Sequence, residues 1–107
     1  MFTVDLEKLT RGEVTSLSGQ PRGLEARKYF DLNQLDEVDE HVIVTAPENL
    51  EALTPSFVQG MFANSVHRLG RERFFDHYQF AISPELRADI DVGIERALMR
   101  REIAGAA

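Results

Sequence analysis

The side chains best suited to acid–base or metal chemistry near neutral pH are three histidines, His41, His67 and His77. No two of them have the spacing that places two ligands together on one helix or strand, and the chain contains no cysteine. Asp76 and His77 are neighbours, but adjacent residues of a strand point to opposite faces and cannot form a catalytic pair. The sequence also lacks a nucleophile elbow, a phosphate-binding glycine loop and a dinucleotide-binding motif. We therefore expect no catalytic residues, no metal site and no cofactor, in a protein that is not an enzyme.

Carboxylates are concentrated in a short run at residues 36–40 (DEVDE). Carboxylate oxygens are the preferred ligands of hard cations such as calcium. The spacing of this run fits no calcium-loop pattern, however, and like charges ahead of an apolar strand are typical of a solvated loop. We interpret the run as a solvated loop that binds no metal.

Ser56 is a candidate phosphoacceptor because it lies in the first turn of the helix expected after Thr54. A phosphate there would lie near the free N–H groups and the positive end of the helix dipole. The alternative is an ordinary first-turn residue that assists Thr54 in capping the helix, and the sequence alone favours it.

The element that must position these groups is a helix over residues 53–70 (LTPSFVQGMFANSVHRLG). Thr54 is a suitable N-cap, Pro55 suits the first helical position, and Gly70 can end the helix. Helical spacing predicts a broad, mostly apolar stripe that faces the core. Its members are Phe57, Val58, Met61, Phe62, Ser65, Val66 and Leu69.

The opposite face of this helix is unusually poor in charge, which is typical of the centre of an interface. It carries Gln59, Gly60, Ala63, Asn64 and His67. Glycine inside a helix costs about 1 kcal/mol relative to alanine, so something is expected to approach Gly60 closely. Two interpretations stay open: this face binds a partner, or another element of the same chain covers it.

The remaining pattern alternates strands with helices. We expect strands near residues 2–6, 13–17, 42–44 and 74–82, and helices over residues 22–35 and from Pro84 onward. The first of these helices should fray near residues 31–33. The apolar run at 42–44 predicts a central strand covered by helices on both faces. The alternation predicts an α/β fold with helices on a mostly parallel sheet, in one domain over residues 1–107 with a flexible tail from about 102.

Composition favours a cytoplasmic protein. Cysteine is absent, no apolar run is long enough to span a membrane, and the N-terminus does not resemble a secretory signal. The net charge of −6 disfavours direct binding to nucleic acid and is ordinarily a solubility feature. The alternative is an acidic decoy that blocks a basic, nucleic-acid-binding partner.

Several short motifs resemble the STAS-like family of unknown function, which is similar to the STAS domains of sulfate transporters and anti-sigma-factor antagonists. They are residues 53–58 (LTPSFV), Phe62, residues 70–74 (GRERF) and the upstream pair Gly23 and Arg27. The resemblance spans roughly residues 18–98, most of the chain. In the anti-sigma-factor antagonists a serine at the start of the equivalent helix is phosphorylated. It corresponds here to Pro55 or Ser56, depending on a one-residue choice of alignment.

The resemblance implies an α/β fold, a single small mixed sheet of four to five strands with helices packed on it, and a role in binding and regulation. The partners that it implies are a histidine-kinase-like ATPase or another regulatory protein, and a homodimer is an additional expectation. We thus carry two hypotheses forward, a regulatory protein–protein interaction module and a small acidic inhibitor of phage or mobile-element type.

Overall fold

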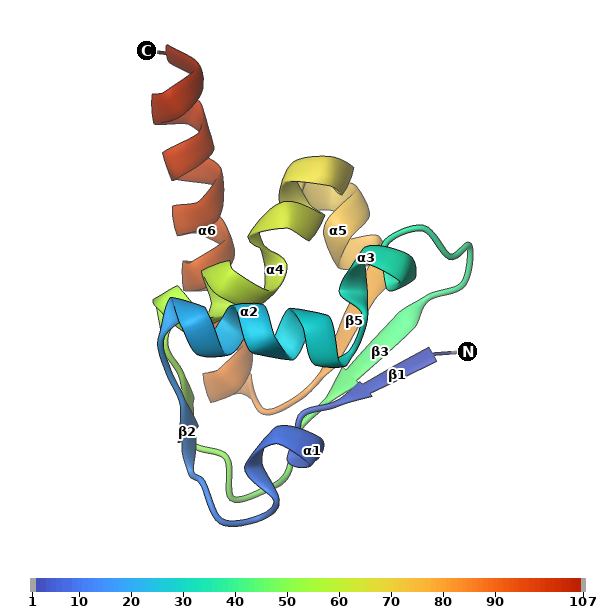
Figure 1. Ribbon diagram of the computed structural model, residues 1–107, viewed down its shortest axis with the longest axis vertical. Helices are drawn as coiled ribbons and strands as arrows, with labels where there is room; N and C mark the ends of the chain where they lie inside the picture. The colour runs from blue at the N-terminus through green and yellow to red at the C-terminus, as the bar shows by residue number, and fades with distance from the viewer. Residues whose placement is uncertain (1, 107) are drawn as a thin grey trace.

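A computed structural model describes the backbone of residues 2–106 and the side chains of residues 2–99 (Figure 1). Its architecture is α/β, with six helices and five strands in the described part. The helices are α1 (Glu7–Thr10), α2 (Gln20–Tyr29), α3 (Leu32–Leu35), α4 (Pro55–Leu69), α5 (Arg71–His77) and α6 (Pro84–Ala106). The strands are β1 (Phe2–Asp5), β2 (Ser16–Leu17), β3 (Val42–Thr45), β4 (Ala52–Leu53) and β5 (Tyr78–Ala81).

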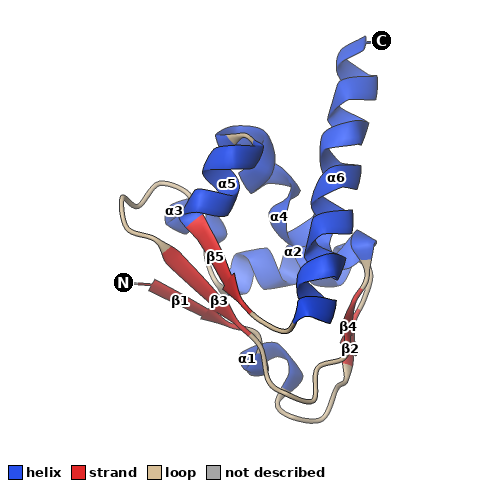
Figure 2. Cartoon of the chain, turned by 180° about the vertical axis from the view of Figure 1, so that it is seen from behind, coloured by secondary structure: helices blue, strands red, loops and turns tan. Residues whose placement is uncertain are grey.

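The strands form two small parallel sheets, so the expected single mixed sheet of four to five strands is wrong. One sheet has three strands in the order β1-β3-β5, and the other pairs β2 with β4. Figure 2 shows the two sheets at opposite sides of the molecule, with the helices between and above them. The separate pair also contacts α6, since Asp89 accepts a hydrogen bond of 3.0 Å from the backbone N–H of Leu53.

Helix α4 is the centre of the molecule and packs most extensively against α2 and α6. Its predicted bounds are confirmed. The side chain of Thr54 accepts a hydrogen bond from the N–H of Phe57, Pro55 begins the helix, and Gly70 follows its last residue. The N–H of Gly70 still bonds to Val66, and its φ of 84° suits a residue without a Cβ. All the predicted stripe residues are buried except Leu69, which is half-buried.

Helices cover one face of the three-stranded sheet and leave the other largely open. Val4, Val42, Val44 and Tyr78 are fully buried on the covered face. The other face carries exposed Thr3, Gln79 and Ala81, with half-buried Ile43 at its centre. The expectation that helices would cover both faces of the 42–44 strand is therefore wrong, although the strand is central in the sheet.

The strand expected over residues 74–82 is half helix. Helix α5 takes up Arg71–His77, and only Tyr78–Ala81 form β5. Phe74 and Tyr78 share a side in a strand, but they are also four residues apart, a spacing that a helix places on one face. The helix expected over residues 22–35 ends at Tyr29, and α3 starts anew after Asp31, whose φ is 52°. The expected fraying near residues 31–33 corresponds to this break.

Helix α6 begins as the sequence predicts, with the hydroxyl of Ser83 accepting a hydrogen bond from the N–H of Leu86. Figure 1 shows its second half rising beyond the body of the molecule. The flexible tail predicted from about residue 102 stays a prediction, since the ribbon is helical to Ala106 and Ala107 lies outside the described residues. Among the helices within residues 2–106, none combines the length and apolar composition needed to cross a membrane.

Candidate interaction site

The charge-poor face of α4 lies between α2 and α6. Gly60 is buried, Gln59, Ala63 and His67 are half-buried, and Asn64 is exposed. A shallow groove of about 160 Å³ runs along this face. It is lined by Gln20, Gln59, Ala63, His67 and Ala97. The interpretation that another element covers this face thus holds for Gly60, while Gln59, Ala63 and His67 border the open groove. Asn64 lies outside the groove and borders a separate depression with Lys28 and Asp31.

Position 60 has room only for glycine, because α2 crosses α4 at this point. A Cβ added to Gly60 would lie 2.4 Å from the carbonyl oxygen of Gln20 and 3.1 Å from the Cα of Gly23. A Cβ on Gly23 would lie 2.2 Å from the carbonyl oxygen of Phe57. Two facing glycines therefore let the backbones of α2 and α4 touch. Gly60 has to be removed from the predicted partner-binding residues, because α2 already occupies the space above it.

His67 connects the groove to α6. Its Nε2–H donates a hydrogen bond of 2.9 Å to the carbonyl oxygen of Ala97. The other histidines also donate to backbone carbonyls: His77 to Leu35 (2.7 Å) and His41 to Asp76 (2.8 Å). Each histidine ring is thus hydrogen-bonded to the backbone of another part of the fold.

Ser56 is exposed in the first turn of α4. Its hydroxyl lies 3.3 Å from the hydroxyl of Thr54, and Thr54 also accepts from the N–H groups of Phe57 (3.3 Å) and Gly19 (3.2 Å). The position is compatible with both interpretations of the serine, because the side chain is accessible and also close to the cap.

A buried polar network joins α2, the α3–β3 loop, α4 and β5. Arg27 donates to Asp36 (2.9 Å), to Ser65 (2.8 Å) and to the carbonyl oxygen of Met61 (2.9 Å). Asp36 also accepts from the hydroxyls of Ser65 (2.6 Å) and Tyr78 (2.5 Å). Asp36 is 5% exposed, so the interpretation of the acidic run as a solvated loop is wrong for this residue. It holds for Glu37, Asp39 and Glu40, which are exposed.

Burial within this network raises the pKa of the Tyr78 hydroxyl far above the ordinary value of 10.0, and the adjacent Asp36 raises it further by accepting its hydrogen bond and by charge. Within the described residues, no buried side-chain nitrogen or oxygen lacks a hydrogen-bond partner. The buried polar groups of the network therefore satisfy one another's hydrogen-bonding capacity inside the fold.

Sequence reasoning missed Arg27 and Asp36 as core residues. A signal for them was present in Ser65, a hydroxyl placed by its spacing in the apolar stripe of α4. A buried hydroxyl needs a hydrogen-bond partner. Tyr78, on the covered face of β5, has a second buried hydroxyl. Two buried hydroxyls call for an acceptor that both can reach, but the sequence does not say which carboxylate it is.

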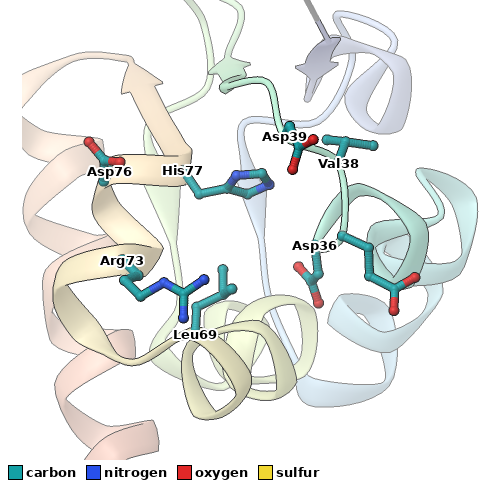
Figure 3. Close-up of a pocket in the computed structure, with 8 residues that line it drawn as sticks. Asp36, Val38, Asp39, Leu69, Arg73, Asp76 and His77 are labelled. Carbon is teal, nitrogen blue, oxygen red and sulfur yellow. The ribbon is translucent and has the colours of Figure 1, made fainter.

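The cleft next to this network opens between the 36–39 segment and the α4–α5 region (Figure 3). The imidazole of His77 points into the cleft toward Val38 and Asp39, whereas the carboxylate of Asp76 points away from it. Arg73 and Asp36 lie on opposite sides of the opening. Asp76 and His77 therefore form no acid–base pair, although the reason is not the one expected, since both residues belong to α5.

Within the described side chains, no group of three histidine, aspartate or glutamate residues is arranged to hold a metal ion. No family model, curated protein or solved structure matches the chain. The resemblance to STAS-like domains thus remains an expectation, and the functional proposal depends on the geometry of the surface.

Proposed function

We propose that the chain is a non-enzymatic regulatory module that binds another protein through the groove between α2, α4 and α6. The observation that carries the proposal is the open, charge-poor part of α4. Gln59, Ala63, Asn64 and His67 bring no formal charge to a helix face that borders solvent. A helix face in contact with water ordinarily carries lysine and glutamate.

The partner class that we propose is a regulatory protein of the kind implied by the resemblance, a histidine-kinase-like ATPase among them, or a second copy of the chain. Ser56 is exposed at the start of the same helix. A phosphate added there would change the charge next to the proposed contact surface, which is a means of regulating association. A cytoplasmic location is part of this proposal.

The acidic-decoy hypothesis has less support. A decoy needs its carboxylates gathered on one face. Asp36, Glu37, Asp39 and Asp76 do line one cleft, but Asp36 is buried. Other exposed acidic residues, including Glu72 on α5 and Glu85 on α6, lie outside that lining. Exposed cations also gather in one groove between α1 and α2, which would not favour a basic partner.

The test introduces a charge at Asn64, the exposed residue of the α4 face beside the groove, without changing the core. Asn64→Lys places a long cationic side chain at an exposed position, and Ala88→Lys places the same side chain on an exposed position of α6 as a matched control. Each variant serves as bait for affinity capture, and light scattering gives its mass in solution.

We expect Asn64→Lys to weaken association at least about tenfold while Ala88→Lys leaves it unchanged, because burying an unpaired charge in an interface is costly. Both variants should keep the circular dichroism spectrum of the wild type. Equal association of all three proteins would contradict the proposed surface. An association that Ala88→Lys alone disrupts would move the site to α6.

A further inference from the structure

A second groove, between α1 and α2, gathers cations in an acidic protein. It has a volume of about 380 Å³. Its lining residues are Lys8, Leu9, Arg11, Leu17, Arg22, Glu25, Ala26 and Tyr29. Three cations thus face a single carboxylate, although the whole chain carries a net charge of −6. We refer to this surface as the cationic groove.

The cations of this groove are not used inside the molecule. Lys8, Arg11 and Arg22 are exposed and form no ion pair with any described residue. Other arginines do have such partners: Arg71 pairs with Glu95, and Arg87 pairs with Asp91 at 3.0 Å and lies over the ring of Phe75. The electrostatic potential of the groove is therefore left for something outside the described chain.

Arg11 occupies a backbone position that disfavours its own side chain. Its φ of 53° is left-handed, at the end of α1, where glycine is the usual residue. A left-handed conformation costs a residue with a Cβ roughly 1–2 kcal/mol. Gly12, which follows directly, is itself left-handed at φ 74°, so two successive residues of this turn adopt conformations that favour glycine and only one of them is glycine. An arginine kept at this cost is best explained by a use for its side chain.

The groove has a shape that suits an extended chain. Arg22, Glu25, Ala26 and Tyr29 follow one face of α2 over about 10 Å of helix. Leu17 and Ala26 form a buried apolar floor, while Tyr29 is 61% exposed at one end. Five of the eight lining residues are exposed, so the groove would not enclose a small molecule as most ligand pockets do.

We infer that the cationic groove binds an acidic segment of a partner protein. The carboxylates of such a segment would reach Lys8 and Arg11 on the α1 side and Arg22 on the α2 side. Its apolar residues would lie against Leu9 and Tyr29. A nucleic acid is the poorer fit, because its phosphates continue past the three cations of the groove, where the net negative charge of the rest of the molecule repels them. This surface lies on a different side of α2 from the α4 crossing, and the inference does not depend on the proposed function.

The direct test uses a short fluorescent peptide of alternating aspartate and leucine, with fluorescence anisotropy as the readout. We expect saturable binding that weakens as salt is added, because exposed charges are screened. Arg11→Glu and Arg22→Glu should each weaken it about tenfold or more. Arg96→Glu changes the net charge equally at an exposed position on α6, outside the groove and without an ion pair to any described residue, and it should have little effect.

Arg11→Gly separates binding from folding. It removes the side chain and relieves the left-handed strain, so it should raise the melting temperature and still weaken peptide binding. Three results would overturn the inference: no saturable binding by the wild type, equal loss in Arg96→Glu, or normal binding by Arg11→Gly. Displacement of the peptide by a nucleoside triphosphate or a single-stranded oligonucleotide that binds more tightly would also overturn it, and would assign the groove to that anion.

Discussion

Asp36 accepts hydrogen bonds from three side chains that come from three different parts of the chain. One carboxylate oxygen accepts from Ser65 and Tyr78, and the other accepts from Arg27. The side chains of Arg27 and Asp36 are 7% and 0% exposed. A buried ion pair is weak evidence for stability by itself, but its partners become costly once one member is removed. Asp36 therefore determines where α2, α4 and β5 can lie relative to one another.

We predict that Asp36→Ala lowers the free energy of unfolding by about 3–5 kcal/mol, since it leaves the guanidinium of Arg27 buried without its charge partner and the hydroxyls of Ser65 and Tyr78 buried without their acceptor. Asp39→Ala is the matched control in the same loop. It removes an exposed carboxylate and should change stability by less than about 0.5 kcal/mol. Urea denaturation of both variants checks the prediction, and similar midpoints would show that the network contributes little.

The raised pKa of Tyr78 predicts a loss of stability at alkaline pH. In the unfolded chain the hydroxyl ionises near its ordinary pKa of 10.0, whereas in the folded protein it stays protonated because burial and Asp36 raise its pKa. As pH rises, the Tyr78 hydroxyl therefore loses its proton in the unfolded chain before it does so in the folded protein. The free energy of unfolding then falls above about pH 10, by at most ~1.4 kcal/mol per pH unit from this group.

Urea midpoints of the wild type and Tyr78→Phe, each measured at pH 8 and again above pH 10, isolate this contribution. The wild type should lose more stability over the interval than Tyr78→Phe. Tyr29→Phe, which changes a 61% exposed tyrosine, should behave like the wild type. The same alkaline loss in all three proteins would contradict the role assigned to Tyr78.

At the scale of elements, the crossing of α2 and α4 depends on two glycines. We predict that Gly60→Ala lowers the free energy of unfolding by about 2 kcal/mol or more. The new Cβ would clash with the backbone of Gln20. The free-energy cost of this overpacking exceeds the ~1 kcal/mol by which alanine is favoured over glycine inside a helix. Asn64→Ala, at an exposed position of α4, should instead be neutral or slightly stabilising. Thermal denaturation distinguishes them, and a stabilised Gly60→Ala would mean that the helices are not in contact here.

Phe62 is the aromatic residue through which α4 meets α5 and β5. It is 1% exposed. The centroid of its ring lies 5.5 Å from the ring centroid of Phe74, 5.8 Å from that of Tyr78 and 5.6 Å from that of Phe80. We predict that Phe62→Ala costs about 3–5 kcal/mol, a large part of the stability of a small domain. Phe2→Ala removes a ring that is 39% exposed and should cost clearly less in the same denaturant titration. Equal costs would place Phe62 outside the core.

Elements with strong local signals could be predicted from the sequence. Helix α4 has its cap, its proline and its terminal glycine in place, and the entry to α6 repeats the cap and the proline. Helix α5 could not be predicted, because a period of two and a period of four coincide at Phe74 and Tyr78. Tertiary packing decides between them, and it brings both rings against Phe62.

At the scale of the whole molecule, the division into two sheets was not predictable. The β2–β4 pair has only two residues in each strand, too few to show a period, and Thr54 and Glu51 extend it through backbone bonds to Leu17 and Thr15. The charge-poor face of the candidate site was visible in the sequence. Its division into a part covered by α2 and a part that borders a groove required the positions of α2 and α6.

The central claim is that the open part of the α4 face is a contact surface. The chain contains no cysteine, so Asn64→Cys introduces a single thiol on that face and Ala88→Cys introduces one on α6 as the control. The decisive measurement is the rate at which a thiol reagent modifies each variant, alone at low concentration and in the complex isolated by capture or formed by a second copy. We predict that complex formation slows modification at position 64 at least several-fold and leaves position 88 unchanged. An unchanged rate at position 64 in a complex that has formed would contradict the account.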